Sequence, residues 1–461
     1  MSRWFTSRVL IACLLTAGLA GCALYHSRPL PTQSDLQPQL APVRLDLDQI
    51  HLPGLKPYPF DPAKGLDGTD VAILAVINNP ALKTARAEAR AGQAQAFVAG
   101  MLPGPQINYS LDHPEHQAPQ YVNGYSAGLA YDLTALVTHG AAASAARATA
   151  KQVDLNLLWQ EWQVAQQARV LYADCLGNRR KLALLTRLNS SMTRRYQAEQ
   201  HAYAAGNLSL ADLGLDLAAL QNVQSLTGTT ATVRNAACRT LNEILGLDPE
   251  VVLNLVPGSD ITVTPTTAVL QQALTKFPQR RPDLLALQYG YQSQDEEVWR
   301  AVLSQFPGIA VGVNRAQDTS DVHTVGFSVS LNFPFLSGGA AAVHAAEATR
   351  DALWSQYQQR LDEAVSEVHL IHADLGVLDQ QLQQIDTTSA DAQQIRAGVQ
   401  AAYTRGDITA PAYYDMNIAA LNRQMTTLDI QVQRQQLQIA LETLLGLPPQ
   451  DLTHPVNETQ R

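Results

Sequence analysis

The second half of this 461-residue sequence repeats the first half at a nearly constant distance. Asn79-Pro80-Ala81-Leu82 matches Arg281-Pro282-Asp283-Leu284 at an offset of 202 residues, and Leu245-Gly246-Leu247 matches Leu445-Gly446-Leu447 at 200. Further matches at these offsets lie between the two. Such a series indicates an internal duplication. We therefore predict two tandem repeats, the first over residues 67–248 and the second over residues 279–449.

Each repeat contains two segments in which apolar and polar residues alternate. The segments span about 105–113 and 123–134 in the first repeat, and about 307–315 and 324–335 in the second. One face carries aromatic or branched side chains such as Tyr109 and Phe327, and the other carries small or polar ones. This alternation predicts β-strands. Their length of roughly 8–10 residues suits a tilted strand that crosses a bilayer.

Four membrane strands cannot stand alone, because lipid offers no hydrogen-bond partner to the edge strands. Known barrels need about eight strands, so we expect several copies to share one barrel. A dimer with eight strands and a trimer with twelve both satisfy closure, and the small inner-face side chains favour the wider, water-filled barrel. A soluble sandwich would show the same alternation, but no further strand-rich segment could supply its second layer.

The segment after each strand pair is predicted to be helical and long. Proline is absent from residues 120–248 and 335–410. Gly206 and Gly406 interrupt these stretches and are followed by residues suited to start a new helix. We therefore predict a helical hairpin in each repeat, with coiled-coil packing. A continuous helix over 140–204 would be about 100 Å long.

The N-terminus has the pattern of an export signal. Arg3 and Arg8 flank the start of an apolar stretch over residues 9–19, which is too short to span a bilayer. The run Leu19-Ala20-Gly21-Cys22 resembles the bacterial lipoprotein box, which implies a signal peptide over residues 1–21 and a covalent lipid on Cys22. Ala23 then implies the outer membrane. An ordinary signal peptide with an incidental cysteine is the alternative.

The composition excludes several classes of function. Charged residues make up 16% and hydrophobic residues 46% of the chain, and the net charge is −9. These values argue against a disordered polyanion and against a nucleic-acid partner. The sequence has no Cys-x-x-Cys, His-Glu-x-x-His or glycine-rich phosphate motif. We therefore expect no enzymatic activity, no metal, and no cofactor apart from the lipid on Cys22.

Taken together, these features resemble the TolC family of outer-membrane efflux proteins, over residues of about 67–449. The resemblance rests on the duplication, on the prolines that open each first strand, and on Tyr-x-x-Gly at each helical tip. It also rests on Asn332-Phe333-Pro334-Phe335-Leu336-Ser337-Gly338-Gly339 and on Leu-Leu-Gly-Leu-Pro-Pro at 444–449. It implies a mainly α-helical homotrimer with a twelve-stranded membrane β-barrel and a twelve-helix periplasmic tunnel.

The same resemblance assigns the remaining segments and the partners. Residues 22–66 would be the lipid anchor and an extended arm, 249–278 an equatorial linker region, and 450–461 a C-terminal tail. A lipidated member resembles the outer-membrane components of resistance-nodulation-division pumps. The expected partners are a periplasmic adaptor, an inner-membrane transporter and outer-membrane lipid.

The family also suggests which residues form a periplasmic gate. Its acids after the second tip line the entrance, and a tyrosine before the tip glycine helps to close it. These positions correspond to Asp415 and Tyr403, with Asp212 as the matching acid of the first repeat. Ala412 and Ile408 replace a second acid and a locking arginine, so a full acid ring with an arginine lock does not transfer.

Asp212 also fits an ordinary helix-capping role, since it follows Ser209 by three residues. The tips themselves would contact the adaptor; they contain the residues Gly206, Asn207, Gly406 and Asp407.

Cys175 and Cys238 lie at equal distances from the tip near residue 206. Both are in register with leucines of their helices, so both side chains should face the opposite arm. A disulfide and two buried free thiols are both compatible with this placement in an oxidising compartment. The equivalent residues Leu375 and Gln438 show that no bond is required. A Cα separation above about 7 Å would exclude the bond.

The sequence therefore predicts a passive exit duct for small molecules in a tripartite efflux system, located in the outer membrane with a long periplasmic portion. A duct for type I protein secretion and a non-conducting structural lipoprotein of the envelope remain alternatives. A soluble helical bundle with an enzymatic role is a third.

Overall fold

The computed structural model describes residues 27–39, 64–115, 121–258, 264–333 and 339–446. The chain divides into two units, residues 1–36 and 37–461, and every helix and strand named below belongs to the second unit. The expected signal peptide, Cys22 and the C-terminal tail lie outside the described residues.

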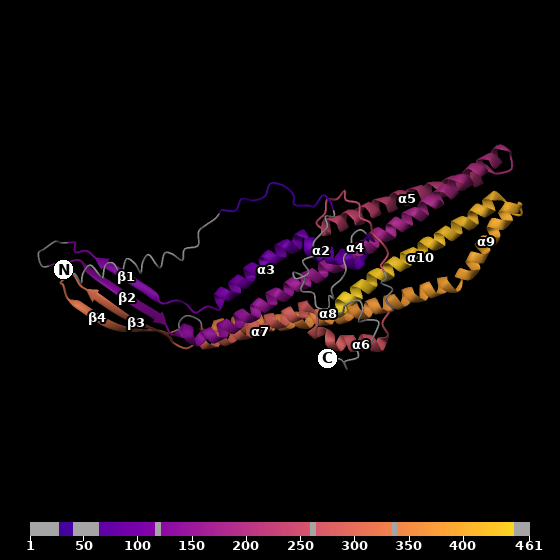
Figure 1. Ribbon diagram of the computed structural model, residues 1–461. Helices are drawn as coiled ribbons and strands as arrows, with labels where there is room; N and C mark the ends of the chain where they lie inside the picture. The colour runs from indigo at the N-terminus through magenta and orange to yellow at the C-terminus, as the bar shows by residue number, and fades with distance from the viewer. Residues whose placement is uncertain (1–26, 40–63, 116–120, 259–263, 334–338, 447–461) are drawn as a thin grey trace. The chain divides into compact units, whose positions relative to one another are not determined.

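Four strands form one antiparallel sheet in the order β1-β2-β3-β4. The strands are β1 (Gln106–Asp112), β2 (Gly124–Asp132), β3 (Gly308–Gln317) and β4 (His323–Asn332). Their bounds differ from the predicted spans by at most three residues. The pairing of β2 with β3 joins the two halves of the chain into a single sheet (Figure 1).

A helix adjoins each strand at the end of the sheet opposite the two hairpin loops. These helices are α3 (Pro80–Ala99) before β1, α4 (Thr134–Ala204) after β2, α7 (Pro282–Leu303) before β3 and α8 (Gly339–Thr387) after β4. α3 packs against α4, α4 against α7, and α7 against α8. The helices therefore follow the order of the strands, and the short α2 (Gly68–Asn78) packs on α4 beside α3.

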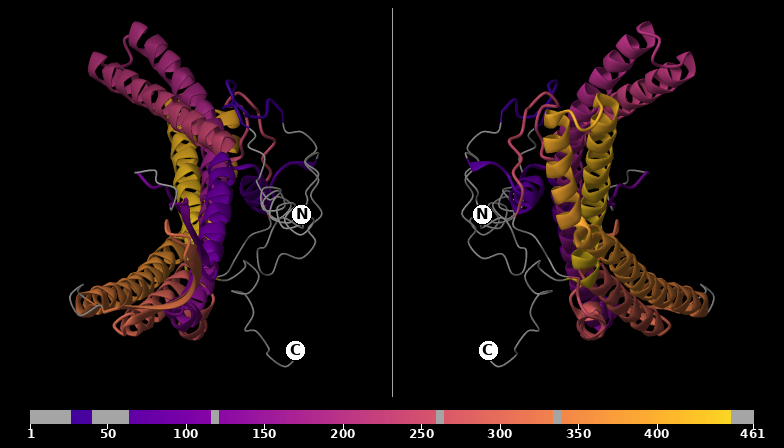
Figure 2. Two further views of the ribbon diagram at one scale, coloured as in Figure 1. Left: turned by 90° about the vertical axis from the view of Figure 1, so that its left-hand side faces the viewer. Right: turned by 90° about the vertical axis from the view of Figure 1, so that its right-hand side faces the viewer.

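Farther from the sheet, two helical hairpins continue this layer. α5 (Leu210–Ile244) returns along α4, and α10 (Ala410–Leu445) returns along α8 and α9 (Ser389–Arg405). α10 also packs on α4, so the order here is α5-α4-α10-α8. Figure 2 shows the two hairpins as separate pairs of helices. Because α4 has 71 residues, it separates the sheet from the first tip by about 105 Å.

The second hairpin differs from the first in one respect that the sequence analysis did not anticipate. α4 is continuous, whereas its counterpart is interrupted at Thr388 between α8 and α9. A guanidinium nitrogen of Arg423 on α10 donates to the carbonyl of Ile385 and, at 2.7 Å, to the hydroxyl of Thr388. The first of these bonds satisfies a backbone carbonyl that a continuous helix would satisfy internally.

Two of the main cores lie where the segment between the two halves of the chain packs on the hairpins. Residues 245–258 run beside the end of the first hairpin, with isolated bridges Gln37↔Leu247 and Leu66↔Leu255. The shorter helices α6 (Thr267–Lys276) and η3 (Phe277–Gln279) follow. One core includes Cys175, Leu241 and Leu245, and a second includes the residues 200 positions later, Leu375, Leu441 and Leu445.

Equivalent side chains also close the last helix of each hairpin. The Asn79 amide donates to the carbonyl of Ile244 at 3.0 Å, and the Arg281 guanidinium donates to the carbonyl of Leu444 at 3.4 Å. Arg86 and Gln288, which are 202 residues apart, likewise donate to the carbonyls of Val76 and Pro278. The offsets found in the sequence therefore identify positions with the same contacts in both halves.

Candidate functional site

The sheet has one apolar face along its whole width. The strand registers place Ile107 beside Leu129, Leu129 beside Val313, and Val313 beside Phe327. Cross-strand partners share a face, so these residues form a continuous apolar row. The large apolar side chains of this face that stay at least 40% exposed are Ile107, Tyr109, Leu111, Leu129, Ile309, Val313, Val325, Phe327, Val329 and Leu331.

The opposite face consists of small and polar residues. Asn108, Gly128, Asn314 and Gly326 are neighbours across the four strands. β1 and β4 form the edges, and neither pairs with any further strand of the described residues. A sheet with an uncovered apolar face and two free edges needs both a surrounding apolar phase and more strands.

The two hairpins meet along α4 and α10, and polar pairs line this contact, which we call the α4–α10 seam. In order toward the tips, the pairs are Arg169–Glu442 (2.7 Å), Asp174–Gln436 (2.6 Å), Lys181–Asp429 (2.8 Å) and Arg195–Asp415. The last three recur at multiples of seven residues on both helices, as in a coiled coil. Apolar residues between them include Leu185, Leu188 and Met425.

Asp415, the expected gate acid, has a cation partner in its own chain. Arg195 contacts it, and the same guanidinium bonds Asp216 on α5 at 2.8 Å and Glu199 at 3.2 Å. Glu199 and Asp216 are buried, whereas the Asp415 side chain is 55% exposed. One arginine therefore connects three helices and is surrounded by three carboxylates.

The sequence analysis did not single out Arg195. The signal that could have identified it is the spacing of opposite charges, since Lys181 and Arg195 on α4 match Asp429 and Asp415 on α10.

The second tip is closed by aromatic packing. Gly406 adopts a left-handed conformation with φ 80°, and Asp407 accepts a 2.7 Å bond from Arg405. Tyr403, the other expected gate residue of this tip, stacks on Tyr413 with ring centroids 4.4 Å apart. The Tyr413 hydroxyl also donates to Gln400 at 2.6 Å. These contacts join the end of α9 to the start of α10.

The first tip has the same backbone geometry and different side-chain contacts. Gly206 has φ 74°. The backbone N–H of Asn207 donates to the carbonyl of Ala202, and the backbone N–H of Asp407 donates to the carbonyl of Ala402 in the same way. Asp212 accepts a 2.7 Å bond from the Ser209 hydroxyl, and its own amide donates to that hydroxyl. These bonds give Asp212 a capping role at the start of α5. The structure thus groups Tyr403 and Asp415 near the second tip, while Asp212 belongs to the first.

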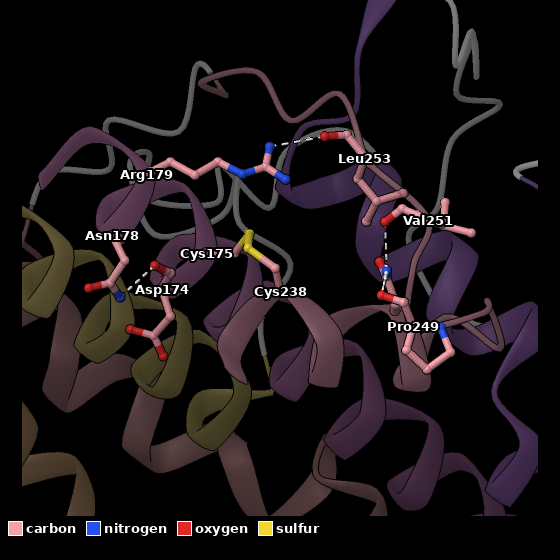
Figure 3. The surroundings of a disulfide bond; sticks show 9 residues. Asp174, Cys175, Asn178, Arg179, Cys238, Pro249, Val251 and Leu253 are labelled. Carbon is pink, nitrogen blue, oxygen red and sulfur yellow. Dashed lines mark hydrogen bonds between the residues drawn. A yellow bond between two sulfur atoms is a disulfide. The ribbon is translucent and has the colours of Figure 1, made fainter. Parts of the chain in front are cut away.

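Cys175 on α4 and Cys238 on α5 are joined in a disulfide, with Cα atoms 5.0 Å apart (Figure 3). Of the two alternatives that the sequence left open, the structure has the bonded pair. Beside it, Arg179 donates to the carbonyl of Leu253 at 2.9 Å. The disulfide therefore fixes the first hairpin where residues 245–258 pack against it.

Two carboxyl groups near the cores have shifted pKa values. Burial raises the pKa of Asp174 in the α4–α10 seam, and the bond from Gln436 opposes this only in part. Burial acts in the same direction on Asp283. There the paired guanidinium groups of Arg281 and Arg360 outweigh it and hold the pKa below its usual range.

No cluster of three potential metal ligands occurs in the described part of the chain. No helix of these same residues is both long and apolar enough to cross a membrane.

Comparison with known proteins gives a family model that matches the second half of the chain and solved structures that share its fold. Residues 270–447 match the family model described as outer membrane efflux protein. No curated protein matches the sequence.

The solved structures that match include several described as channels. The channel OprN is similar with a TM-score of 0.69 at 16% identity, over 93% of this chain and 100% of that one. CusC, a protein whose structures are described in terms of folding and transmembrane channel formation, is similar with a TM-score of 0.68 at 17% identity and the same coverage. The Campylobacter jejuni outer membrane channel CmeC gives 0.64 at 14% identity, over 92% of this chain and 95% of that one.

At such identities the likeness shows the fold, which is mostly helical with one small sheet. The family model over residues 270–447 and the fold of the chain agree with the resemblance that the sequence predicted.

Proposed function

We propose that this protein is a trimeric outer-membrane channel and the passive exit duct of a tripartite efflux system. The observation that carries the proposal is the sheet, with its apolar face, its small polar face and its two free edges. In a membrane the apolar face would contact lipid, and the polar face would line a water-filled lumen. Three copies would close twelve strands, since β4 of each copy would pair with β1 of the next.

The helices support the same assembly. Between the sheet and the cores, α3, α4, α7 and α8 form one layer in strand order. If three copies close the barrel, these layers form a twelve-helix wall that continues the lumen through the periplasm. The two tandem repeats explain why each copy contributes two equivalent hairpins to both barrel and wall.

The gate would lie near the helical tips. The Arg195–Asp415 pair holds the second hairpin to the first, and the Tyr403–Tyr413 stack holds α9 to α10. Movement of the second hairpin away from the first requires loss of the Arg195–Asp415 contact. Asp415 therefore acts with Arg195 in closure, and three copies of the pair would surround the entrance.

The remaining parts of the proposal rest on the sequence. Cys22 would carry the covalent lipid after removal of residues 1–21, and residues 22–66 would link it to the helical body. The tips near Gly206 and Gly406 would contact a periplasmic adaptor, which connects the duct to an inner-membrane transporter. No catalysis is needed, because the transporter supplies the energy.

Three measurements test the proposal and its alternatives. The purified protein should run as a heat-resistant trimer on gels and should conduct ions in planar bilayers. A non-conducting trimer would favour a structural envelope lipoprotein and contradict the channel. Deletion of the gene should cause hypersensitivity to small toxic molecules; loss of a secreted protein with normal drug resistance would instead favour type I secretion.

A further inference from the structure

Two helix faces of the hairpins carry exposed apolar side chains near the tips. Leu215 on α5 is 70% exposed and Ile395 on α9 is 57% exposed. In the chain, α5 packs chiefly on α4, and no residue of α9 is buried among those that the structure describes. α5 packs on α4 and α9 packs on α10, so these two faces lie on the outer helices on either side of the α4–α10 seam, where a neighbouring helix could cover them.

The α4–α10 seam provides an internal template for such a neighbour. It joins the first arm of one hairpin to the second arm of the next hairpin. In a ring of copies, the same relation holds between α8 and α9 of one copy and α5 of the following copy. The offset of 200 residues then assigns the contacts, because core positions at this offset already match within the chain.

Four template contacts transfer in this way. Arg195–Asp415, Lys181–Asp429, Gly177–Val432 and Asp174–Gln436 become Ile395–Leu215, Gln381–Thr229, Val377–Thr232 and Asp374–Ala236. All eight transferred residues are exposed in the single chain. At these four contacts, all of which lie on the tip side of Arg169–Glu442, both transferred positions are therefore accessible.

The chemistry changes from ionic to apolar at the tip end. Arg195 and Asp415 form an ion pair, whereas their equivalents are isoleucine and leucine. Of the eight transferred residues only Asp374 is charged. An apolar pair gains from burial without an opposite charge and is insensitive to salt, whereas a half-exposed ion pair is weak and is screened.

We propose that Leu215 on α5 of one copy packs against Ile395 on α9 of its neighbour, and that this apolar pair forms the contact between copies at the entrance. The partner is a second copy of this chain, and the inference rests on the proposed function because it requires the trimer. The entrance then has two kinds of contact: ionic ones within each copy and apolar ones between copies. Salt screens only the first kind, so raising the salt concentration should weaken the contacts within a copy and leave those between copies unchanged.

The contact is tested by cross-linking the full-length protein with Leu215→Cys and Ile395→Cys in one chain. Mild oxidation should give covalent trimers that reduction reverses, and neither single variant should give them. The matched control combines Leu215→Cys with Gln393→Cys, because two residues turn a helix by about 200° and place Gln393 on the opposite side of α9. We expect at least tenfold less cross-linked trimer from the control.

The possible outcomes separate this contact from the proposed function. Native, conducting trimers in which the test pair cross-links no better than the control would overturn the contact and leave the channel intact. A cross-link formed within one chain, seen as a faster-migrating monomer, would also overturn it. Absence of any trimer and of conductance would overturn the proposed function itself.

A second pair of variants transplants the ionic contact. Leu215→Asp alone should lower the temperature at which the trimer dissociates, and adding Ile395→Arg should restore it at low salt. The restored trimer should then become salt-sensitive, unlike the natural one. Recovery that does not depend on salt would contradict a direct contact between these two positions.

Discussion

The two halves of the chain meet the same structural requirement with different side chains. In the first hairpin, Leu188 is buried in a continuous α4, and Val223 packs against the same cluster. Two hundred residues later the same positions hold Thr388 and Arg423. The helix is interrupted at Thr388, and Arg423 donates hydrogen bonds to the carbonyl of Ile385 and to the hydroxyl of Thr388. The second hairpin therefore accommodates a local break because the carbonyl of Ile385 finds a new partner in Arg423.

The ends of the hairpins show the same principle. Asn79 and Arg281 both donate to the last turn of a long helix, although one is a small amide and the other a buried cation. The first hairpin is fixed by a disulfide, while its counterpart relies on Leu375 and Gln438 in the core. Positions are therefore preserved between the halves and chemistry is not.

The largest expected effect comes from removing Arg281. Its side chain is fully buried and makes a bidentate bond to Asp283 at 2.9 and 2.6 Å. Arg281→Ala leaves that carboxylate with Arg360 alone and exposes the carbonyl of Leu444. We expect Arg281→Ala to lower the free energy of unfolding by about 3–5 kcal/mol, and Asn79→Ala to lower it by about 1–2 kcal/mol. Thermal unfolding of the purified variants measures both, and equal losses would contradict the assigned difference.

The second effect concerns the disulfide, which closes a sequence separation of 63 residues. Replacing Cys175 and Cys238 by alanine should cost about 2–4 kcal/mol, mainly because the unfolded chain gains freedom. The matched variant carries Leu375→Cys and Gln438→Cys in the second half. If the halves are equivalent, these cysteines bond and raise the unfolding temperature. Free thiols at these positions, detected by alkylation, would limit the equivalence.

A smaller effect is expected at two of the charged contacts of the α4–α10 seam, Arg195–Asp415 and Lys181–Asp429. Asp415→Asn removes the half-exposed partner of Arg195, while Glu199 and Asp216 keep the arginine paired. A loss of about 1 kcal/mol in the stability of the closed state should shift the equilibrium toward the open state about fivefold. Conductance in planar bilayers should therefore rise. Asp429→Asn, farther from the tips, is the matched control and should change conductance less. An equal response of both variants would remove Asp415 from the gate.

The smallest effect is a pH dependence at Asp174. Its pKa in the folded state is raised, because burial disfavours the charged form of the carboxyl group. This cost is present above the folded pKa and disappears as the pH falls through it. Asp174→Asn should therefore raise the free energy of unfolding slightly at pH 7, by less than about 1 kcal/mol, and give no gain near pH 3. A gain that persists at pH 3 would point to another cause.

Some elements could be located from the sequence because their signals are local. The alternation around Tyr109 and Phe327 marked the strands to within three residues, and Gly206 and Gly406 marked the turns that need a positive φ. The position of Cys175 relative to Cys238 followed from helical register about the tip. Each of these signals involves residues close in sequence or related by one hairpin.

The candidate gate was only partly accessible in this way. Asp415 and Tyr403 were named from a family resemblance, but their partners Arg195 and Tyr413 were not. Asp212 was assigned two roles by the sequence, and its bonds to Ser209 favour capping. The break at Thr388 left no sequence signal, because neither threonine nor the distant Arg423 marks a helix end alone.

Local patterns in the sequence were enough to locate the strands, the turns and the two sheet faces, since periodicity and backbone preference act over a few residues. Only the tertiary structure decided that α10 packs on α4, that Arg195 gathers three carboxylates and that Arg281 closes the last helix. The physical reason is that such contacts join residues up to 273 positions apart. Their partners depend on how whole helices are placed, which no local pattern encodes.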